Sequence, residues 1–134
     1  MDRVSGSRLQ RKILIVEDHD DSRSLLAEYF SGVGYHVETA TDGNVAIAAA
    51  LQTHPDVIVL DLAMPGLDGA DALAVMRSYP STMETPIVVC TGQPDMLSKR
   101  ALKYSALLVK PCSPFEVERA VSLALGDQPE TDTG

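Results

Sequence analysis

Acidic residues stand directly after two apolar runs of this sequence, where each run gives way to a turn. Asp61 follows the run 57–60, and Glu17 with Asp18 follows the run 13–16. A buried strand that ends in a carboxylate places a negative charge at the edge of a sheet, where the ligands of α/β proteins bind. These three carboxylates are therefore the first candidates for a functional site.

Two further polar side chains follow apolar runs: Thr91 comes after the run 87–90 and Lys110 after the run 106–109. Clustered carboxylates repel one another, and a bound cation relieves the repulsion. Oxygen ligands with positions left for water favour Mg²⁺ over Ca²⁺. With Mg²⁺ and Lys110 neutralising its charge, Asp61 could attack a phosphoryl group as a nucleophile, and the Thr91 hydroxyl could donate to a phosphoryl oxygen.

Each of these residues also has an ordinary structural interpretation. An acidic residue after a strand is often a helix cap or a turn former. A lysine before a proline is commonly a solvated charge, and a threonine in a strand is commonly chosen for its β-branched shape. The joint arrangement on several strands favours a site. The three histidines, His19, His36 and His54, share no metal-binding spacing, and we expect them at the surface.

Strand-like and helix-like patterns alternate five times along the chain, and the central strands are apolar throughout. This alternation predicts an α/β fold, in which helices cover both faces of a parallel sheet. Right-handed crossovers then favour the doubly wound, flavodoxin-like strand order 2-1-3-4-5, which brings all the candidate residues to one edge. The predicted strands are 12–16, 36–40, 56–60, 86–90 and 106–109, and the predicted helices are about 22–31, 43–53, 69–78, 94–103 and a last one that opens with a capping box at Ser113.

Composition restricts the class of protein further. The 134 residues are 45% hydrophobic, which suits one folded domain, expected at 12–126 between disordered tails at 1–11 and 127–134. The net charge of −8 argues against direct binding of nucleic acid. The N-terminal apolar run is too short for a signal peptide or a membrane span, so we expect a cytoplasmic protein. Cys90 and Cys112 form no zinc or disulfide pattern, and Cys90 is expected to be a small buried hydrophobe.

In combination, these motifs resemble the receiver domain of two-component response regulators, the CheY-like superfamily, over about residues 12–125. The matching segments are Ile-Leu-Ile-Val-Glu-Asp at 13–18, Asp-Gly at 42–43, Pro-Asp-Val-Ile-Val-Leu-Asp-Leu-Ala-Met-Pro-Gly-Leu-Asp-Gly at 55–69, Thr-Gly at 91–92 and Lys-Pro at 110–111. The resemblance implies that Asp61 accepts phosphate from a histidine kinase or a histidine phosphotransfer protein. It also implies Mg²⁺ ligands, namely Glu17, Asp18, Asp61 and the carbonyl of Ala63. Thr91 and Lys110 would contact the phosphoryl group, and the peptide bond at 110–111 is often cis in this family.

The sequence departs from the family pattern at the residues that usually report phosphorylation. An aromatic residue normally stands three positions before the lysine, where this chain has Leu107, and the usual Gly-Ala upstream is replaced by Lys103-Tyr104. Leucine has no ring to move between exposed and buried rotamers, so we expect Leu107 to stay buried in both states. An activation signal from Thr91 would then travel through 92–94 and the following helix, with Tyr104 as a possible substitute reporter.

We therefore predict a phosphoprotein that changes its affinity for a downstream partner, and not an enzyme beyond assisting its own phosphotransfer and dephosphorylation. No DNA-binding or enzymatic domain is expected after the last helix. A free-standing regulator, a phosphate relay or sink, and an excised domain all stay open. One alternative is a small Mg²⁺-dependent phosphohydrolase with an aspartyl-phosphate, which usually carries a second acid where this chain has Ala63. Another is a receiver-shaped scaffold that acts without phosphorylation.

Overall fold

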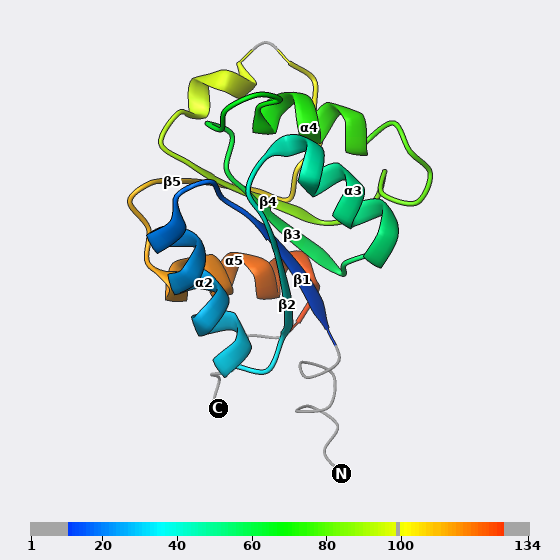
Figure 1. Ribbon diagram of the computed structural model, residues 1–134. Helices are drawn as coiled ribbons and strands as arrows, with labels where there is room; N and C mark the ends of the chain where they lie inside the picture. The colour runs from blue at the N-terminus through cyan, green and yellow to red at the C-terminus, as the bar shows by residue number, and fades with distance from the viewer. Residues whose placement is uncertain (1–10, 99, 128–134) are drawn as a thin grey trace.

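The computed structural model describes residues 11–98 and 100–127, which form one α/β layer structure (Figure 1). Its elements in chain order are β1 (Lys12–Val16), α2 (Asp20–Gly32), β2 (His36–Ala40), α3 (Gly43–Thr53), β3 (Val57–Leu60), α4 (Gly69–Met76), β4 (Ile87–Thr91), the 3₁₀ turn η1 (Pro94–Leu97), β5 (Ala106–Val109) and α5 (Pro114–Ala124).

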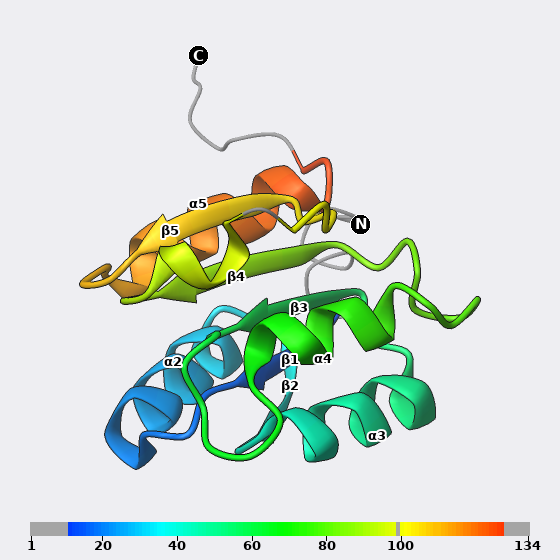
Figure 2. The ribbon, with the colours of Figure 1, turned by 90° about the horizontal axis from the view of Figure 1, so that it is seen from above.

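The five strands pair in parallel in the order β2-β1-β3-β4-β5. This is the predicted doubly wound topology, and it is confirmed. Helices α2 and α5 cover one face of the sheet, while α3 and α4 cover the other (Figures 1 and 2). Because every strand runs in the same direction, the segments that follow β1, β3, β4 and β5 all leave the sheet at one edge.

Alternate residues of the strands fill two separate apolar layers. Leu14 of β1 and Ile58 of β3 belong to the layer under α3 and α4, whereas Ile13 and Val57 belong to the layer under α2 and α5. All four are buried. Both layers draw on the same strands, which explains why the central runs are apolar without alternation: a strand covered on both faces has no side that faces water.

Side chains satisfy the free amides at three of the helix starts. Asp42 Oδ1 accepts a hydrogen bond from the Val45 amide at 2.9 Å, and Asp68 Oδ1 accepts one from the Asp71 amide at 2.9 Å. The predicted capping box of α5 is confirmed by the reciprocal pair of Ser113 Oγ with the Glu116 amide and Glu116 Oε1 with the Ser113 amide. Such caps stabilise a helix start by about 1 kcal/mol each.

The helix predicted over 94–103 is wrong beyond its first turn, so the described residues contain four α-helices and one 3₁₀ turn where five helices were expected. Backbone angles at Ser98 (φ −58°, ψ 135°) end the turn. Tertiary contacts hold the following segment: the Arg77 guanidinium donates to the Lys103 carbonyl at 2.9 Å, and Arg100 pairs with Asp71 at 3.1 Å. Leu97 is the buried residue of the turn, and Met96 and Leu102 pack against the same apolar layer from either side of it.

The ends of the described chain lie close together. Arg11 Nη2 is 3.1 Å from Asp127 Oδ1, so residues at the inner ends of the two predicted tails form an ion pair. The other residues of those tails, 1–10 and 128–134, lie outside the described residues. Among the helices that are described, none combines the length and the apolar character needed to cross a membrane.

Candidate functional site

The carboxylates that follow β1 and β3 are brought together by the strand pairing itself. The Asp61 amide donates to the Val16 carbonyl at 3.1 Å, and the Glu17 amide donates to the Ala40 carbonyl at 3.0 Å. Both residues are therefore fixed to neighbouring strands by backbone bonds. They are also buried, with 4% of Asp61 and 2% of Glu17 exposed. Two carboxylates at this depth require compensating charge.

Lys110 supplies part of that charge from the end of β5. Its Nζ lies 2.7 Å from Glu17 Oε1 and 3.1 Å from Asp61 Oδ2. Partial burial of the ammonium lowers its pKa, but the hydrogen bonds to Glu17 and then to Asp61 outweigh this effect and hold the Lys110 pKa above its ordinary value of 10.5. The lysine is therefore protonated throughout the physiological range.

Asp18 and His19 complete the acidic side of the cluster. The His19 amide and ring Nδ1 lie 3.1 and 3.2 Å from Glu17 Oε2, and Nδ1 is 3.6 Å from Asp18 Oδ1. Asp18 Oδ1 is buried and accepts no hydrogen bond from the described part of the chain. A buried carboxylate oxygen without a donor is costly. This atom is therefore suited to a cation.

The carboxylates of the cluster suit a hard divalent cation. Ligand atoms of Glu17, Asp18 and His19 all lie within 4.8 Å of one another. Three carboxylates and one ammonium leave two negative charges uncompensated, which a divalent ion would balance. Within the described residues this set does not include Asp61. The Asp61 Oδ2 faces Lys110, and its Oδ1 accepts from the Ala63 amide at 3.2 Å.

The prediction that all three histidines lie at the surface is confirmed, because His19, His36 and His54 are all exposed. The contact of His19 with the acidic residues was not predicted. Its side chain is 73% exposed and reaches back along the turn to Glu17. The available signal was its position directly after Glu17-Asp18, which a regular spacing of histidines does not reveal.

Thr91 and Lys110 are held together at the ends of β4 and β5. The Lys110 amide donates to the Thr91 carbonyl at 2.9 Å, and the Thr91 Oγ1 accepts from the Gln93 amide at 3.0 Å. Thr91 is fully buried. The peptide bond between Lys110 and Pro111 is cis, as the resemblance implied.

Gly69 allows the loop after Asp61 to return closely to the strand. Gly69 is the first residue of α4, and its amide donates a hydrogen bond to the Leu62 carbonyl at 2.9 Å. A Cβ at this position would overlap the Asp61 carbonyl oxygen and the Leu62 Cα. Gly66, in the turn between them, has a φ of +70°, which few other residues adopt without strain. The loop geometry therefore depends on glycine at two positions.

Leu107 and Tyr104, the predicted switch positions, differ in their surroundings. Leu107 lies on β5 opposite Val89 and is partly buried, packed against the layer that contains Leu97. It lies on the face of the sheet that η1 and α4 cover. Tyr104 precedes β5 and is exposed.

Comparison with known proteins agrees with this fold. The family model of the response regulator receiver domain matches residues 13–122. Transcriptional regulatory protein ResD of Bacillus subtilis (strain 168) is 36% identical over 120 residues, which cover 87% of this chain and 48% of ResD. Regulatory protein AtoC of Escherichia coli (strain K12) is 33% identical over 117 residues, which cover 85% of this chain and 25% of AtoC. The chain spans between a quarter and a half of the length of these curated relatives.

Solved structures show the same similarity. Chemotaxis response regulator CheY4 of Vibrio cholerae aligns with a TM-score of 0.78 at 30% identity, covering 86% of this chain and 98% of that one. The receiver domain of sensor histidine kinase PA1611 from Pseudomonas aeruginosa PAO1 aligns with a TM-score of 0.80 at 27% identity, covering 87% and 98%, and that structure has a magnesium ion coordinated in its active site cleft. The fold and the family match thus define a signalling domain of two-component systems. This chain belongs to the response regulator receiver domain family.

Proposed function

We propose that Asp61 is the phosphoacceptor of this receiver domain and that its phosphorylation by a histidine kinase or a histidine phosphotransfer protein changes the domain's affinity for a protein partner. The observation that carries the proposal is the contact of Lys110 with Asp61 inside a buried acidic cluster. A buried carboxylate that already contacts an ammonium has its charge partly neutralised before a phosphoryl donor approaches.

The residues around Asp61 support distinct roles in the transfer. Asp61 Oδ1 accepts from the Ala63 amide, which fixes the orientation of the carboxylate. Attack by a carboxylate oxygen on the phosphorus of a phosphohistidine forms the acyl-phosphate bond as the P–N bond breaks, and the leaving imidazole takes up a proton. Lys110 would move part of its hydrogen bonding from Asp61 to the incoming phosphoryl oxygens. The buried Thr91 hydroxyl, near the end of the neighbouring strand, would donate to another oxygen.

Glu17 and Asp18, with Asp61 and the Ala63 carbonyl, are proposed to hold Mg²⁺. When bound, the ion would supply positive charge opposite the developing charge on the phosphoryl oxygens. The unpartnered Asp18 Oδ1 and the two uncompensated negative charges support the assignment. Asp61 Oδ2 contacts Lys110 in this structure. To bind the ion, the Asp61 carboxylate would therefore have to turn one oxygen away from the lysine.

The chain is proposed to act as a signalling domain whose only chemistry is its own phosphotransfer and dephosphorylation. Position 63, where many aspartyl-phosphate phosphohydrolases carry a second acid, holds an alanine, which supports the signalling role over the phosphohydrolase. The intact acidic set and Lys110 argue against a scaffold that acts without phosphorylation. The cytoplasmic location and the lack of direct nucleic-acid binding stay predictions from the sequence.

Phosphorylation of intact protein with acetyl phosphate and Mg²⁺ tests the proposal. Wild type should gain the mass of one phosphoryl group, and Asp61→Asn should gain none. Asp71→Asn is a matched control, because Asp71 is a half-exposed aspartate on α4 that pairs with Arg100, and it should be phosphorylated like wild type. Equal uptake by wild type and Asp61→Asn would refute Asp61 as the acceptor.

The metal assignment has its own test with Asp18→Asn. Asparagine preserves the shape of the side chain and removes one negative charge. Wild type should show a rise in melting temperature with added Mg²⁺ that EDTA reverses, and Asp18→Asn should show little or none. Asp20→Asn is the control, since Asp20 is exposed and pairs with Arg23. An equal Mg²⁺ response in Asp18→Asn and wild type would contradict the assignment.

A further inference from the structure

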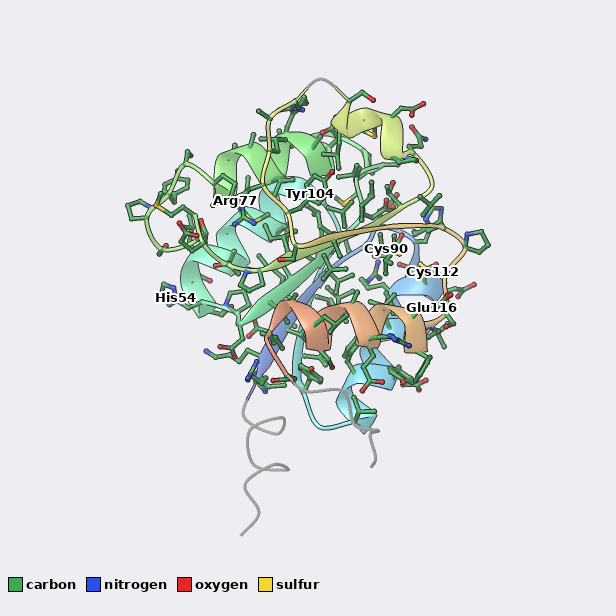
Figure 3. The ribbon with its side chains drawn as sticks, turned by 180° about the vertical axis from the view of Figure 1, so that it is seen from behind. His54, Arg77, Cys90, Tyr104, Cys112 and Glu116 are labelled. Carbon is green, nitrogen blue, oxygen red and sulfur yellow. The ribbon has the colours of Figure 1, made fainter. Side chains whose placement is uncertain are left out.

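Cys90 and Cys112, which are 22 positions apart in the chain, lie side by side near the carboxyl edge of the sheet (Figure 3). Their Sγ atoms are 2.8 Å apart, and both cysteines are free thiols. A disulfide bond is about 2.05 Å long, so the two sulfurs need approach each other by only roughly 1 Å to bond. The burial predicted for Cys90 is confirmed, but its neighbour Cys112 was not foreseen.

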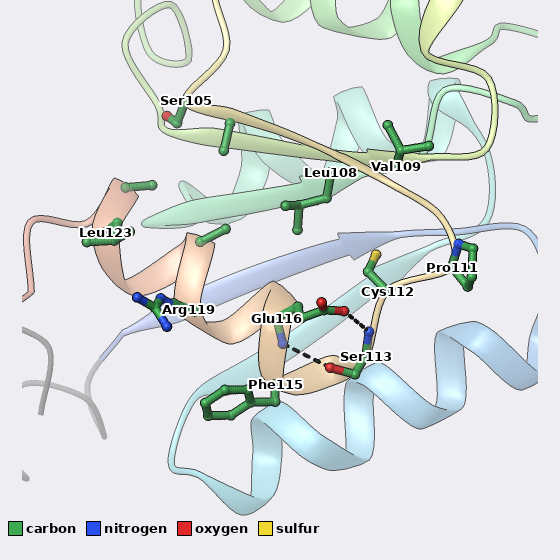
Figure 4. A pocket seen from close by; sticks show the side chains of 13 residues that line it. Ser105, Leu108, Val109, Pro111, Cys112, Ser113, Phe115, Glu116, Arg119 and Leu123 are labelled. Atoms are coloured by element: carbon green, nitrogen blue, oxygen red, sulfur yellow. Dashed lines mark hydrogen bonds between the residues drawn. The ribbon is translucent and has the colours of Figure 1, made fainter. Parts of the chain in front are cut away.

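The backbone on both sides of the pair is already fixed. Cys90 directly precedes Thr91, whose carbonyl accepts from the Lys110 amide at 2.9 Å. Cys112 stands between Pro111 and the Ser113 capping box of α5, and its side chain points toward the sheet (Figure 4). Little conformational freedom is therefore left to lose when the two sulfurs bond, which favours bond formation.

A small oxidant has a route to the pair. Both cysteines line one cavity of about 380 Å³ beside Lys110 and Pro111. Cys90 is 5% exposed, whereas Cys112 is only partly buried. Burial, followed by the contact with Cys112, raises the pKa of the Cys90 thiol well above its ordinary value. Cys112 is therefore the thiol that meets an oxidant first, and Cys90 is the thiol that resolves the product.

We propose that Cys90 and Cys112 are a redox-sensitive pair that a hydroperoxide converts to an intramolecular disulfide. Cys112 Sγ attacks a peroxide oxygen and the O–O bond breaks. The leaving oxygen takes up the thiol proton and departs as an alcohol or, from hydrogen peroxide, as water, so that Cys112 is oxidised by two electrons to a sulfenic acid. Cys90 Sγ then attacks Cys112 Sγ. The S–O bond breaks, the hydroxyl leaves with the Cys90 proton as water, and the disulfide is complete. A thiol reductant returns both residues to the starting state.

The disulfide would connect the redox state to the phosphorylation site, a consequence that rests on the proposed function. It would tie the residue before Thr91 to the residue that follows Lys110-Pro111. Any movement of the Thr91 hydroxyl relative to Lys110 during phosphoryl binding would then be resisted. We expect oxidised protein to need a several-fold higher concentration of beryllofluoride, a phosphoryl mimic, for half-saturation.

Intact mass measurement of the whole chain tests the bond. Reduced protein treated with hydrogen peroxide, then unfolded and alkylated, should have lost two hydrogen atoms and should take up no alkyl group. Trypsin should release peptide 78–99 linked to peptide 104–119, since the bond before Pro111 resists cleavage. Recovery of the two peptides unlinked, with Cys112 oxidised to sulfinic or sulfonic acid and Cys90 alkylated, would overturn the proposal. Linkage between two molecules rather than within one would overturn it as well.

Cys112→Ser is the matched control, because it changes one atom of a partly exposed side chain. Peroxide should leave its Cys90 available for alkylation and its beryllofluoride binding unchanged. If wild type forms the bond and binds beryllofluoride equally in both redox states, the coupling to the site is wrong. If reduced wild type binds no beryllofluoride with Mg²⁺, the proposed function fails, while the linked peptides still establish the redox pair.

Discussion

Lys110 Nζ lies nearer to Glu17 Oε1, at 2.7 Å, than to Asp61 Oδ2, at 3.1 Å. The ammonium thus joins the ends of β1, β3 and β5 through side chains, in addition to the backbone pairing of the sheet. Glu17 and Asp61 are almost fully buried, and the charge of Lys110 is their main compensation within the described residues. The contact that we propose to prepare Asp61 for phosphoryl transfer therefore also compensates two buried carboxylates of the fold.

Replacement of Lys110 by methionine should lower the free energy of unfolding by about 2–4 kcal/mol in metal-free buffer, because two buried carboxylates lose their counter-charge. Urea titration with EDTA present measures the change. The control is Lys103→Met, since Lys103 is 71% exposed and 3.8 Å from the exposed Glu84. That variant should stay within about 0.5 kcal/mol of wild type. Equal effects of the two substitutions would contradict the stabilising role of the Lys110 contact.

The stability difference between wild type and Lys110→Met should not change between about pH 7 and pH 9. The folded-state pKa of Lys110 is raised, so its contribution is complete below the ordinary value of 10.5 and declines only as the pH rises through the higher folded-state value. Urea titrations of both proteins across this range check the expectation. A difference that disappears before about pH 9 would mean that the lysine is not held in its charged form.

The sequence was sufficient for the sheet order and for the position of the acidic residues, because apolar strands and following carboxylates are local patterns. It was insufficient for residues 100–105, whose course depends on the contact of Lys103 with Arg77 and of Arg100 with Asp71, residues more than 25 positions apart in the chain. The partner of Cys90 was missed for the same reason. The pairing of β4 with β5 and the turn at Pro111 determine where Cys112 lies, and neither can be seen as a spacing of cysteines.

Gly69→Ala should destabilise the protein by about 1–3 kcal/mol, because the added methyl group overlaps the Asp61 carbonyl oxygen and cannot be accommodated without moving the backbone. The displacement falls on Asp61 itself, so phosphorylation by acetyl phosphate should also slow. Gly32→Ala is the control: it lies at the end of α2 with no atom near the new methyl group, and it should be neutral or slightly stabilising. Thermal unfolding and the rate of mass gain are the two measurements.

Phosphorylation should change the segment after β4 more than the outer strand β5. Leu107 is packed against the apolar layer that includes Leu97, so its side chain has a buried position to keep in both states. The Thr91 hydroxyl oxygen, by contrast, accepts a hydrogen bond from the Gln93 amide. If the hydroxyl moves toward a phosphoryl group, this hydrogen bond breaks and the loop after Thr91 moves. Backbone NMR with Mg²⁺, with and without beryllofluoride, should therefore show its larger shifts over 92–100. Dominant shifts at Leu107 and in α5, with the loop after Thr91 unchanged, would show that the signal takes another route.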